Sequence, residues 1–216
     1  MTLFNRTALV LACSLGITAA AQAVVKGIPE ESGVSGSFAL GAGALNYTSN
    51  MVVGTSFFDA ADDTINDLGS PDDDSTGVPV FSYDLRYTFA ESRVQLFAGN
   101  ALPDFLRFDF ATQFGVRKQF DTIGIVGIAY LNNTFPAKVW EDPYLTNVKR
   151  GKTDRTSNGV SLKWEKIFNS HFSLELRSRD IDIDDELSGQ SIVPPLANPK
   201  DSLSREGDQV SAENLY

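Results

Sequence analysis

The sequence is short of the residues that most often carry chemistry. Among 216 residues it has one cysteine, Cys13, and one histidine, His171. So few nitrogen and sulfur ligands exclude most transition-metal sites, and a lone cysteine excludes an internal disulfide. No segment after the N-terminal region reaches 18 consecutive apolar residues, which excludes a helical membrane span. With 18 basic and 28 acidic residues the net charge is −10, which argues against a nucleic-acid partner. We expect no cofactor.

The first 23 residues are typical of a secretory signal peptide. Arg6 supplies a positive charge, an apolar stretch covers 7–21, and Ala-Gln-Ala at 21–23 is a small-x-small cleavage site. The mature chain, 24–216, would form one domain without cysteine and with a net charge of −11, since Arg6 is the only ionisable residue removed. Two alternatives stay open. One is a membrane anchor helix, for which the stretch is short against the roughly 20 residues needed; the other is lipoprotein processing at Cys13.

The clearest pattern is a strict alternation over 80–89. Successive side chains of a strand point to opposite faces, so the odd positions form one apolar face: Phe81, Tyr83, Leu85, Tyr87 and Phe89. The even positions carry Val80, Ser82, Asp84, Arg86 and Thr88 on the other, mostly polar face. A soluble β-sandwich would bury the aromatic face, whereas a transmembrane barrel would turn it towards lipid and the charges towards a wet lumen.

Eight segments show such alternation and none indicates an amphipathic helix. They lie at 34–47, 78–89, 93–99, 105–117, 122–131, 157–167 and 172–183, with a last one from 207 onwards. Tight connections at 90–92, 118–121 and 168–171 alternate with mostly long ones at 48–77, 132–156 and 184–206. Short turns at one rim and long loops at the other are typical of outer-membrane barrels. We therefore expect an all-β, antiparallel, up-and-down transmembrane β-barrel.

In the segments at 78–89, 105–117 and 157–167 the alternating charges fall on one face. The lumen-facing candidates are Asp84, Arg86, Arg107, Asp109, Arg117, Lys163, Glu165, Glu175 and Arg177. In a narrow barrel they would pair into a closed plug, and in a wider one they would line a water-filled passage and set its charge selectivity. Candidates for the interfacial aromatic girdles, with ordinary core packing as the alternative, are Phe81, Phe89, Phe120, Tyr130, Trp164 and Phe172.

One segment departs from the pattern. Ile181 and Ile183 change phase relative to Leu176, which indicates a β-bulge or a strand that continues outside the membrane.

Few residues suit catalysis or metal binding. His171 stands beside Ser170 in a predicted turn with no nearby acid to orient the ring, so we expect a solvated histidine and no enzyme. Acidic runs occur at 59–74 and 180–186, and Asp180, Asp182 and Asp184 are weak candidates for a calcium site. Neither run has EF-hand spacing, so solvated acidic loops are the simpler interpretation.

Several strings carry a resemblance to a known family. They are IPEESG at 28–33, VWEDPYLT at 139–146, KRGKTDRTSNG at 149–159, FSLEL at 172–176 and RDIDID at 179–184. Together they resemble outer-membrane proteins of marine Gram-negative bacteria labelled domain of unknown function 2860. The resemblance implies a location in the outer membrane and a barrel fold, and it implies no catalytic or binding residues. Members of that family are longer than this chain.

The C-terminal segment leaves two interpretations. Tyr216 and Val210 fit the terminal signal read by barrel-assembly machinery, and Asn214 does not. The chain is then either a complete eight-stranded barrel or a C-terminally truncated piece of a barrel of about 12 strands. The expected function is a non-enzymatic outer-membrane barrel that admits small solutes through a charged lumen. Its expected partners are outer-membrane lipid and the assembly machinery. The alternatives are a structural or adhesive surface barrel with acidic loops and a secreted soluble sandwich that binds a ligand.

Overall fold

The computed structural model describes residues 27–51, 53–55, 57, 62–69, 71, 73–100, 110–192 and 202–215. The expected signal peptide and the candidates Arg107 and Asp109 lie outside these residues. The described part contains ten strands and a short 3-10 helix, η1 (Ile167–Asn169). The strands are β1 (Gly33–Thr48), β2 (Gly54–Thr55), β3 (Asp73–Phe89), β4 (Val94–Asn100), β5 (Phe110–Phe120), β6 (Gly124–Phe135), β7 (Ala137–Trp140), β8 (Lys152–Glu165), β9 (Ser173–Ile183) and β10 (Gly207–Leu215).

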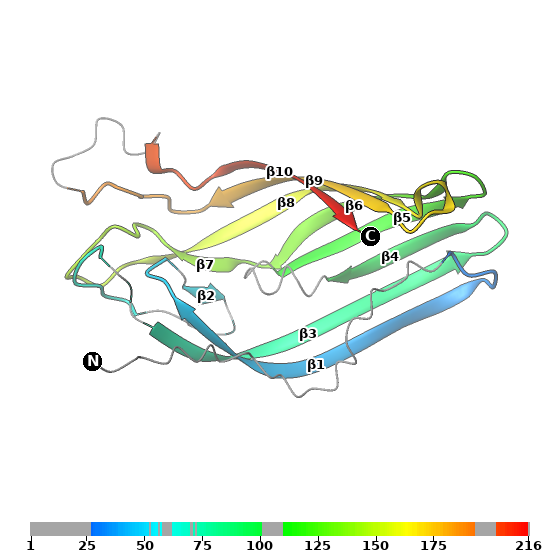
Figure 1. Ribbon diagram of the computed structural model, residues 1–216. Helices are drawn as coiled ribbons and strands as arrows, with labels where there is room; N and C mark the ends of the chain where they lie inside the picture. Colours follow the sequence, from blue (N-terminus) through cyan, green and yellow to red (C-terminus); the bar gives the residue numbers. More distant parts are fainter. Residues whose placement is uncertain are drawn as a thin grey trace, which may run out of the picture.

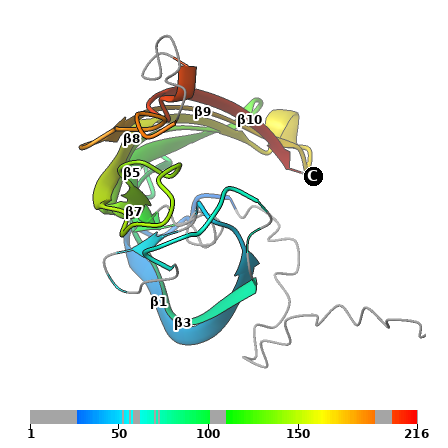
Figure 2. The ribbon, with the colours of Figure 1, turned by 90° about the vertical axis from the view of Figure 1, so that its left-hand side faces the viewer.

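All strands belong to one antiparallel sheet (Figure 1). Its order is β1-β3-β4-β5-β6-β8-β9-β10, with β7 beside the start of β8 and β2 beside β7. Viewed from the end with the long connections, the sheet bends into a trough (Figure 2). The expected all-β antiparallel fold is confirmed. The sheet is not closed into a ring, because among the described residues β1 pairs only with β3 and β10 only with β9.

The two rims differ as the sequence predicts. Turns at 90–93, 121–123 and 166–172 join β3 to β4, β5 to β6 and β8 to β9 at one rim, on the right of Figure 1. The connections at 49–72, 141–151 and 184–206 leave from the opposite rim. Gly124 closes one tight turn with a φ of +99°, and a Cβ there would lie 2.3 Å from the Lys166 carbonyl oxygen. Glycine tolerates that backbone conformation and that close approach.

Two short strands interrupt connections that were expected to be irregular. β7 continues the line of β6 after Pro136, which lacks the N–H that a ladder bond needs. β2 then pairs with β7 through Gly54 and Thr55. Strands β3, β6 and β8 also run further towards the long-loop rim than the alternation predicted. Tertiary pairing extends them through segments that carry no clear apolar period.

Of the two interpretations of Ile181 and Ile183, the β-bulge is absent and the strand continues. The register of β8 with β9 runs without a break from Trp164 opposite Leu174 to Arg155 opposite Ile183. The strand therefore keeps its phase and simply continues: Ile183 is 4% exposed, whereas Asp180 and Asp182 are exposed on the other face. A register shift occurs instead between Phe110 and Ala111 on β5.

One apolar cluster lies near the long-loop rim. Val78 and Phe110 are its buried members, with Val80, Phe81 and Phe135 packed against them. Phe81 stacks on Phe110 at 5.8 Å between ring centroids, and Phe57 packs edge-on against Phe135 at 4.7 Å. Much of what is buried elsewhere is polar. Within the described residues, no helix has the length and apolar character that a membrane crossing requires.

Candidate functional site

Strand alternation gives the sheet a polar concave face. Arg117 on β5 reaches Glu165 on β8, and Lys163 on β8 reaches Gln113 on β5, in both cases across the intervening β6. Gly127 makes this possible, because it lies in register with Arg117 and Lys163 and a Cβ there would come within 3.0 Å of the Arg117 Cβ. A glycine on the middle strand thus lets long side chains of its neighbours meet.

One half of the concave face is a chain of hydrogen bonds from β3 to β8. The Gln95 amide donates to the Thr88 hydroxyl at 2.7 Å and accepts from Arg117 through Nε at 2.9 Å and Nη2 at 2.7 Å. Arg117 Nη1 donates to Glu165 at 2.9 Å. Thr88 and Gln95 are 2% and 1% exposed, so these bonds fix the guanidinium from its buried side.

The other half centres on Glu175 of β9. Its Oε1 accepts from Arg177 Nε at 2.6 Å and from the Ser161 hydroxyl at 2.7 Å, and it lies 3.5 Å from Lys163 Nζ. Lys163 donates at 3.0 Å to the neutral amide of Gln113 and lies over the Phe97 ring at 5.8 Å. The shortest hydrogen bond of this ammonium is therefore to an uncharged group.

A cavity of about 70 Å³ opens between these groups. A third ion pair stands at its edge, where Arg86 donates through Nε and Nη2 to both oxygens of Asp84 at 2.6 and 2.7 Å. The cavity is lined by Asp84, Arg86, Phe97, Gln113, Arg117, Gly127, Lys163 and Glu165. Five of these eight residues are charged, so the space is suited to a hydrated or polar solute rather than an apolar ligand.

The described lumen-facing candidates fall on this one face. Asp84, Arg86, Arg117, Lys163 and Glu165 line the cavity, and Glu175 and Arg177 lie beside it. The sequence reasoning missed the uncharged members of the network, namely Gln95, Phe97, Gln113 and Ser161. Their odd positions place them on the same face as the charged residues, but the prediction of lumen-facing residues considered ionisable side chains alone.

The convex face is apolar and exposed. Cross-strand register aligns its side chains in rows; one row joins Tyr87, Leu96, Val116, Ile128, Leu162 and Leu176. Their exposed fractions run from 37% to 52%. We call these residues and their exposed apolar neighbours the convex belt: Val34, Phe38, Leu40, Leu85, Phe89, Phe114, Phe120, Val126, Tyr130, Val160, Phe172 and Val210.

Most girdle candidates lie in or beside this belt. Phe89, Phe120, Tyr130 and Phe172 are 40–46% exposed. Trp164 donates its indole N–H to the Ile123 carbonyl at 2.7 Å and packs edge-on against Phe168. Phe81 differs, since it belongs to the small aromatic core described above.

A polar row borders the belt on the side of the long connections. Register places Asn100, Thr112, Asn132, Asn158, Asp180 and Asp208 in line across six strands. Asn132 donates to Asn158 along the row at 2.5 Å, and the Thr112 hydroxyl lies 2.8 Å from the hydroxyl of Tyr83 on β3, outside the row. The convex face thus changes from apolar to polar at one level.

The long connections form an ordered cap around Trp140. This side chain is fully buried, and the Arg150 guanidinium lies 3.9 Å from its ring centroid. Arg150, 2% exposed, donates to the carbonyls of Asn50 at 2.9 Å and Asp62 at 2.7 Å. Burial lowers the pKa of Arg150, against the opposing effect of Asp63 and Asp62. Hydrogen bonds from Lys152 and Lys149 lower the pKa of Asp63. The same contacts tie the connection at 49–72 to the connection at 141–151 and to the first residue of β8.

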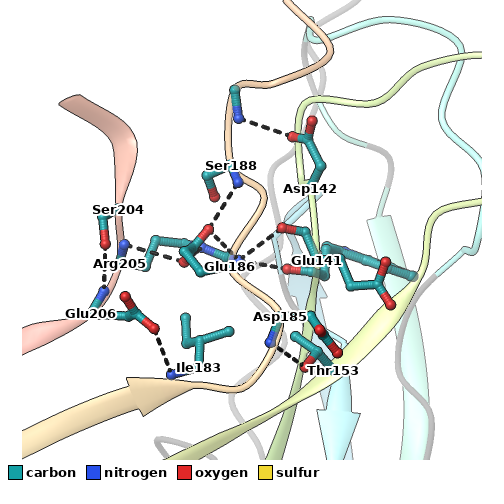
Figure 3. Close-up of polar contacts among 12 residues, drawn as sticks. Glu141, Asp142, Thr153, Ile183, Asp185, Glu186, Ser188, Ser204, Arg205 and Glu206 are labelled. Atoms are coloured by element: carbon teal, nitrogen blue, oxygen red, sulfur yellow. Dashed lines mark hydrogen bonds and ion pairs between the residues drawn. The ribbon is translucent and has the colours of Figure 1, made fainter. Parts of the chain in front are cut away.

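The third connection joins this cap through Glu186 and Arg205 (Figure 3). Arg205 Nε donates to Glu186 at 2.9 Å, and Nη2 donates to the Trp140 carbonyl at 2.6 Å. Burial opposes ionisation of Glu186, but hydrogen bonds from Arg205 and Ser188 outweigh it and hold its pKa below the ordinary value. Strings at 139–146, 149–159 and 179–184, which carried the family resemblance, contribute much of this cap and the strand ends beside it.

Neither the calcium candidates nor the histidine gathers into a site. Asp180 and Asp182 are exposed on the convex face, while the Asp184 backbone N–H donates to the Asp154 carbonyl. In the part of the chain that the structure describes, no three acidic, histidine or cysteine side chains converge as metal ligands. His171 is exposed in the turn between β8 and β9.

Comparison with known proteins places the chain in one family. No curated protein and no solved structure matches it. A family model described as "Protein of unknown function (DUF2860)" matches residues 33–216, from the first residue of β1 through all the strands. The chain therefore belongs to this family of proteins of unknown function.

Proposed function

We propose that this protein spans the outer membrane with its strands, has no catalytic role, and admits small water-soluble solutes along its concave face. One observation carries the proposal: the sheet has an apolar, exposed convex face and a charged, hydrogen-bonded concave face. A soluble protein rarely exposes so large a contiguous apolar surface. In a bilayer the same surface contacts lipid, and the charges lie in a wet interior.

The dimensions of the convex belt support a bilayer. Phe172, just before β9, and Asp180 on β9 mark its two borders and lie eight residues apart, or roughly 26 Å at about 3.3 Å per residue. Strand tilt reduces this to about 20 Å, against an apolar band of about 25 Å for outer-membrane barrels. The Trp164 indole near the tight turns and the polar row on the opposite side suit the two interfaces.

The proposal requires that the outer edges of β1 and β10 be paired in the membrane. Unpaired backbone groups in hydrocarbon cost several kcal/mol each. The seven consecutive antiparallel pairings make β10 antiparallel to β1, so the two edges have compatible directions for pairing with each other. The expected location, with a cleaved signal peptide and assembly by the barrel machinery, belongs to this proposal.

Folding into detergent and then into planar bilayers tests it. A membrane barrel should migrate faster on a denaturing gel before boiling than after, show a β-rich circular dichroism spectrum, and give discrete conductance steps. A well-folded monomer without detergent would refute the membrane assignment and favour a soluble binding protein. A heat-modifiable species without any current would refute the solute passage alone.

A surface structural or adhesive role is the second candidate, and the cap favours it. Three long connections packed around Trp140, with Arg150 and Glu186 buried, form a defined surface rather than separate loops. Such a surface would act outside the cell. Loss of cell-surface attachment when the cap is altered, with conductance unchanged, would assign the function to the cap.

A further inference from the structure

The cavity on the concave face is positive although the chain is strongly acidic. Three cations, Arg86, Arg117 and Lys163, line it against two carboxylates, Asp84 and Glu165. The whole chain has a net charge of −10. The next carboxylate, Glu175, is already held by Arg177 at 2.6 Å. The local excess of positive charge therefore runs against the overall balance of the protein.

Lys163 is the cation least neutralised by its neighbours. Arg86 has both oxygens of Asp84, and Arg117 has Glu165 at 2.9 Å. Lys163 has an uncharged amide at 3.0 Å and only a shared carboxylate at 3.5 Å. Its side chain is 21% exposed, so the ammonium is partly desolvated yet still reachable from the cavity. A partly desolvated charge attracts a counter-ion more strongly than a charge in bulk water.

The surrounding groups hold the other cations in place before any solute arrives. Asp84 holds Arg86 through two hydrogen bonds. Gln95 and Thr88 fix Arg117 from behind, and Gly127 leaves open the space in front of it. Fixed donors around an open space favour a small anion with several oxygen acceptors, because little reorganisation is needed on binding.

We infer that this cavity is a binding site for small oxyanions, such as phosphate or a short carboxylate, and that it makes the proposed passage anion-selective. The selectivity rests on the proposed function, whereas the binding site does not. Lys163 is the residue that the inference assigns to direct anion contact, with Arg86 and Arg117 as the fixed positive charges beside it.

Binding is tested first, in protein folded in an uncharged detergent, with inorganic phosphate as the probe and calorimetry as the readout. Lys163→Gln should weaken phosphate binding about tenfold, as expected for the loss of one charge-assisted hydrogen bond. Lys163→Arg should restore most of it. Lys118→Gln is the matched control, since Lys118 is exposed beside Phe120 on the convex side and the charge change is the same. Heat-modifiability of each variant reports that it has folded.

Reversal potentials across a salt gradient then test selectivity. The wild type should favour the anion, Lys163→Gln should shift the ratio towards the cation, and Lys118→Gln should not. Absence of phosphate binding to the folded wild type, or an equal loss in both glutamine variants, would overturn the inference. Phosphate binding lost only in Lys163→Gln, but without any current, would support the site and reject the passage. Current with a cation preference and no phosphate binding would support the passage and overturn the proposed anion site.

Discussion

The sharpest test of the membrane assignment compares two side chains of nearly equal exposure. Ile128 is 50% exposed on the convex face, and Val148 is 49% exposed in the connection at 141–151. Both are β-branched aliphatic residues at positions open to solvent in the isolated protein. They differ in expected surroundings, because Ile128 would contact lipid and Val148 would contact water. Because the two side chains are equally exposed, a difference between their arginine variants would report whether lipid or water surrounds each position.

The expected magnitude follows from depth in the bilayer. Ile128 is in register with Leu162 and Leu176, and Leu176 lies midway between the borders Phe172 and Asp180. An arginine at the midplane of the lipid face costs about 2–4 kcal/mol, or about 30- to 700-fold in the unfolding equilibrium. Arginine at Val148 should change the free energy of unfolding by no more than about 0.5 kcal/mol, as is usual for a surface position.

The assay is denaturant unfolding of protein folded into phosphatidylcholine vesicles, followed by tryptophan fluorescence. Ile128→Thr is a further control, because it keeps the strand preference of a β-branched residue while adding one hydroxyl. If Ile128→Arg and Val148→Arg both unfold within about 0.5 kcal/mol of the wild type, the convex face is in water and the reasoning is wrong.

Three further outcomes are expected from the cap and the concave face. Glu186, whose folded pKa is lowered from 4.5, stabilises the cap above its unfolded pKa, and this contribution is lost as the pH falls through the lower folded value. The hydrogen-exchange protection of the cap amides, measured relative to the intrinsic rate at each pH, should therefore fall in acid, and Glu186→Gln should remove that dependence. Arg150→Ala should destabilise the cap by about 1.5–3 kcal/mol through its lost charged hydrogen bonds, seen as faster chymotryptic cleavage in 49–72, whereas Lys149→Ala at a 78% exposed side chain should not. Gly127→Ala should cost about 1–3 kcal/mol by overpacking the concave face, measured in the same unfolding assay, while Gly77→Ala, with no atom within 4 Å of the added Cβ, should be neutral.

The sequence was a good guide wherever alternation is strict. The face assignment of 80–89 agrees with the structure from Asp84 to Phe89, where charges lie inside and aromatic residues outside. It was a poor guide near the long connections. There Phe81 packs against Phe110 of β5 and Phe135 of β6. The pairing of these two strands shifts register beside Phe110. No local pattern announces such packing, because it depends on which distant strands meet.

The candidate site shows the same division. The odd or even position along each strand identified the charges of the concave face. It did not show that Arg117 would reach β8, or Lys163 reach β5, across Gly127 of β6. The cap was missed altogether. Trp140 and Arg150 looked like ordinary loop residues, and only their contacts with Asn50 reveal a shared buried centre.

By itself, the sequence determined the antiparallel all-β class, the polarity of the two faces and the alternation of short and long connections. These properties follow from the two-residue period of a strand and from the position of turn residues, both of which are local. The tertiary structure decided the rest: the register that aligns the apolar and polar rows, the cavity over Gly127, and the packing of three connections around Trp140. These features join residues up to 100 positions apart, so each depends on how the whole sheet curves rather than on any one segment.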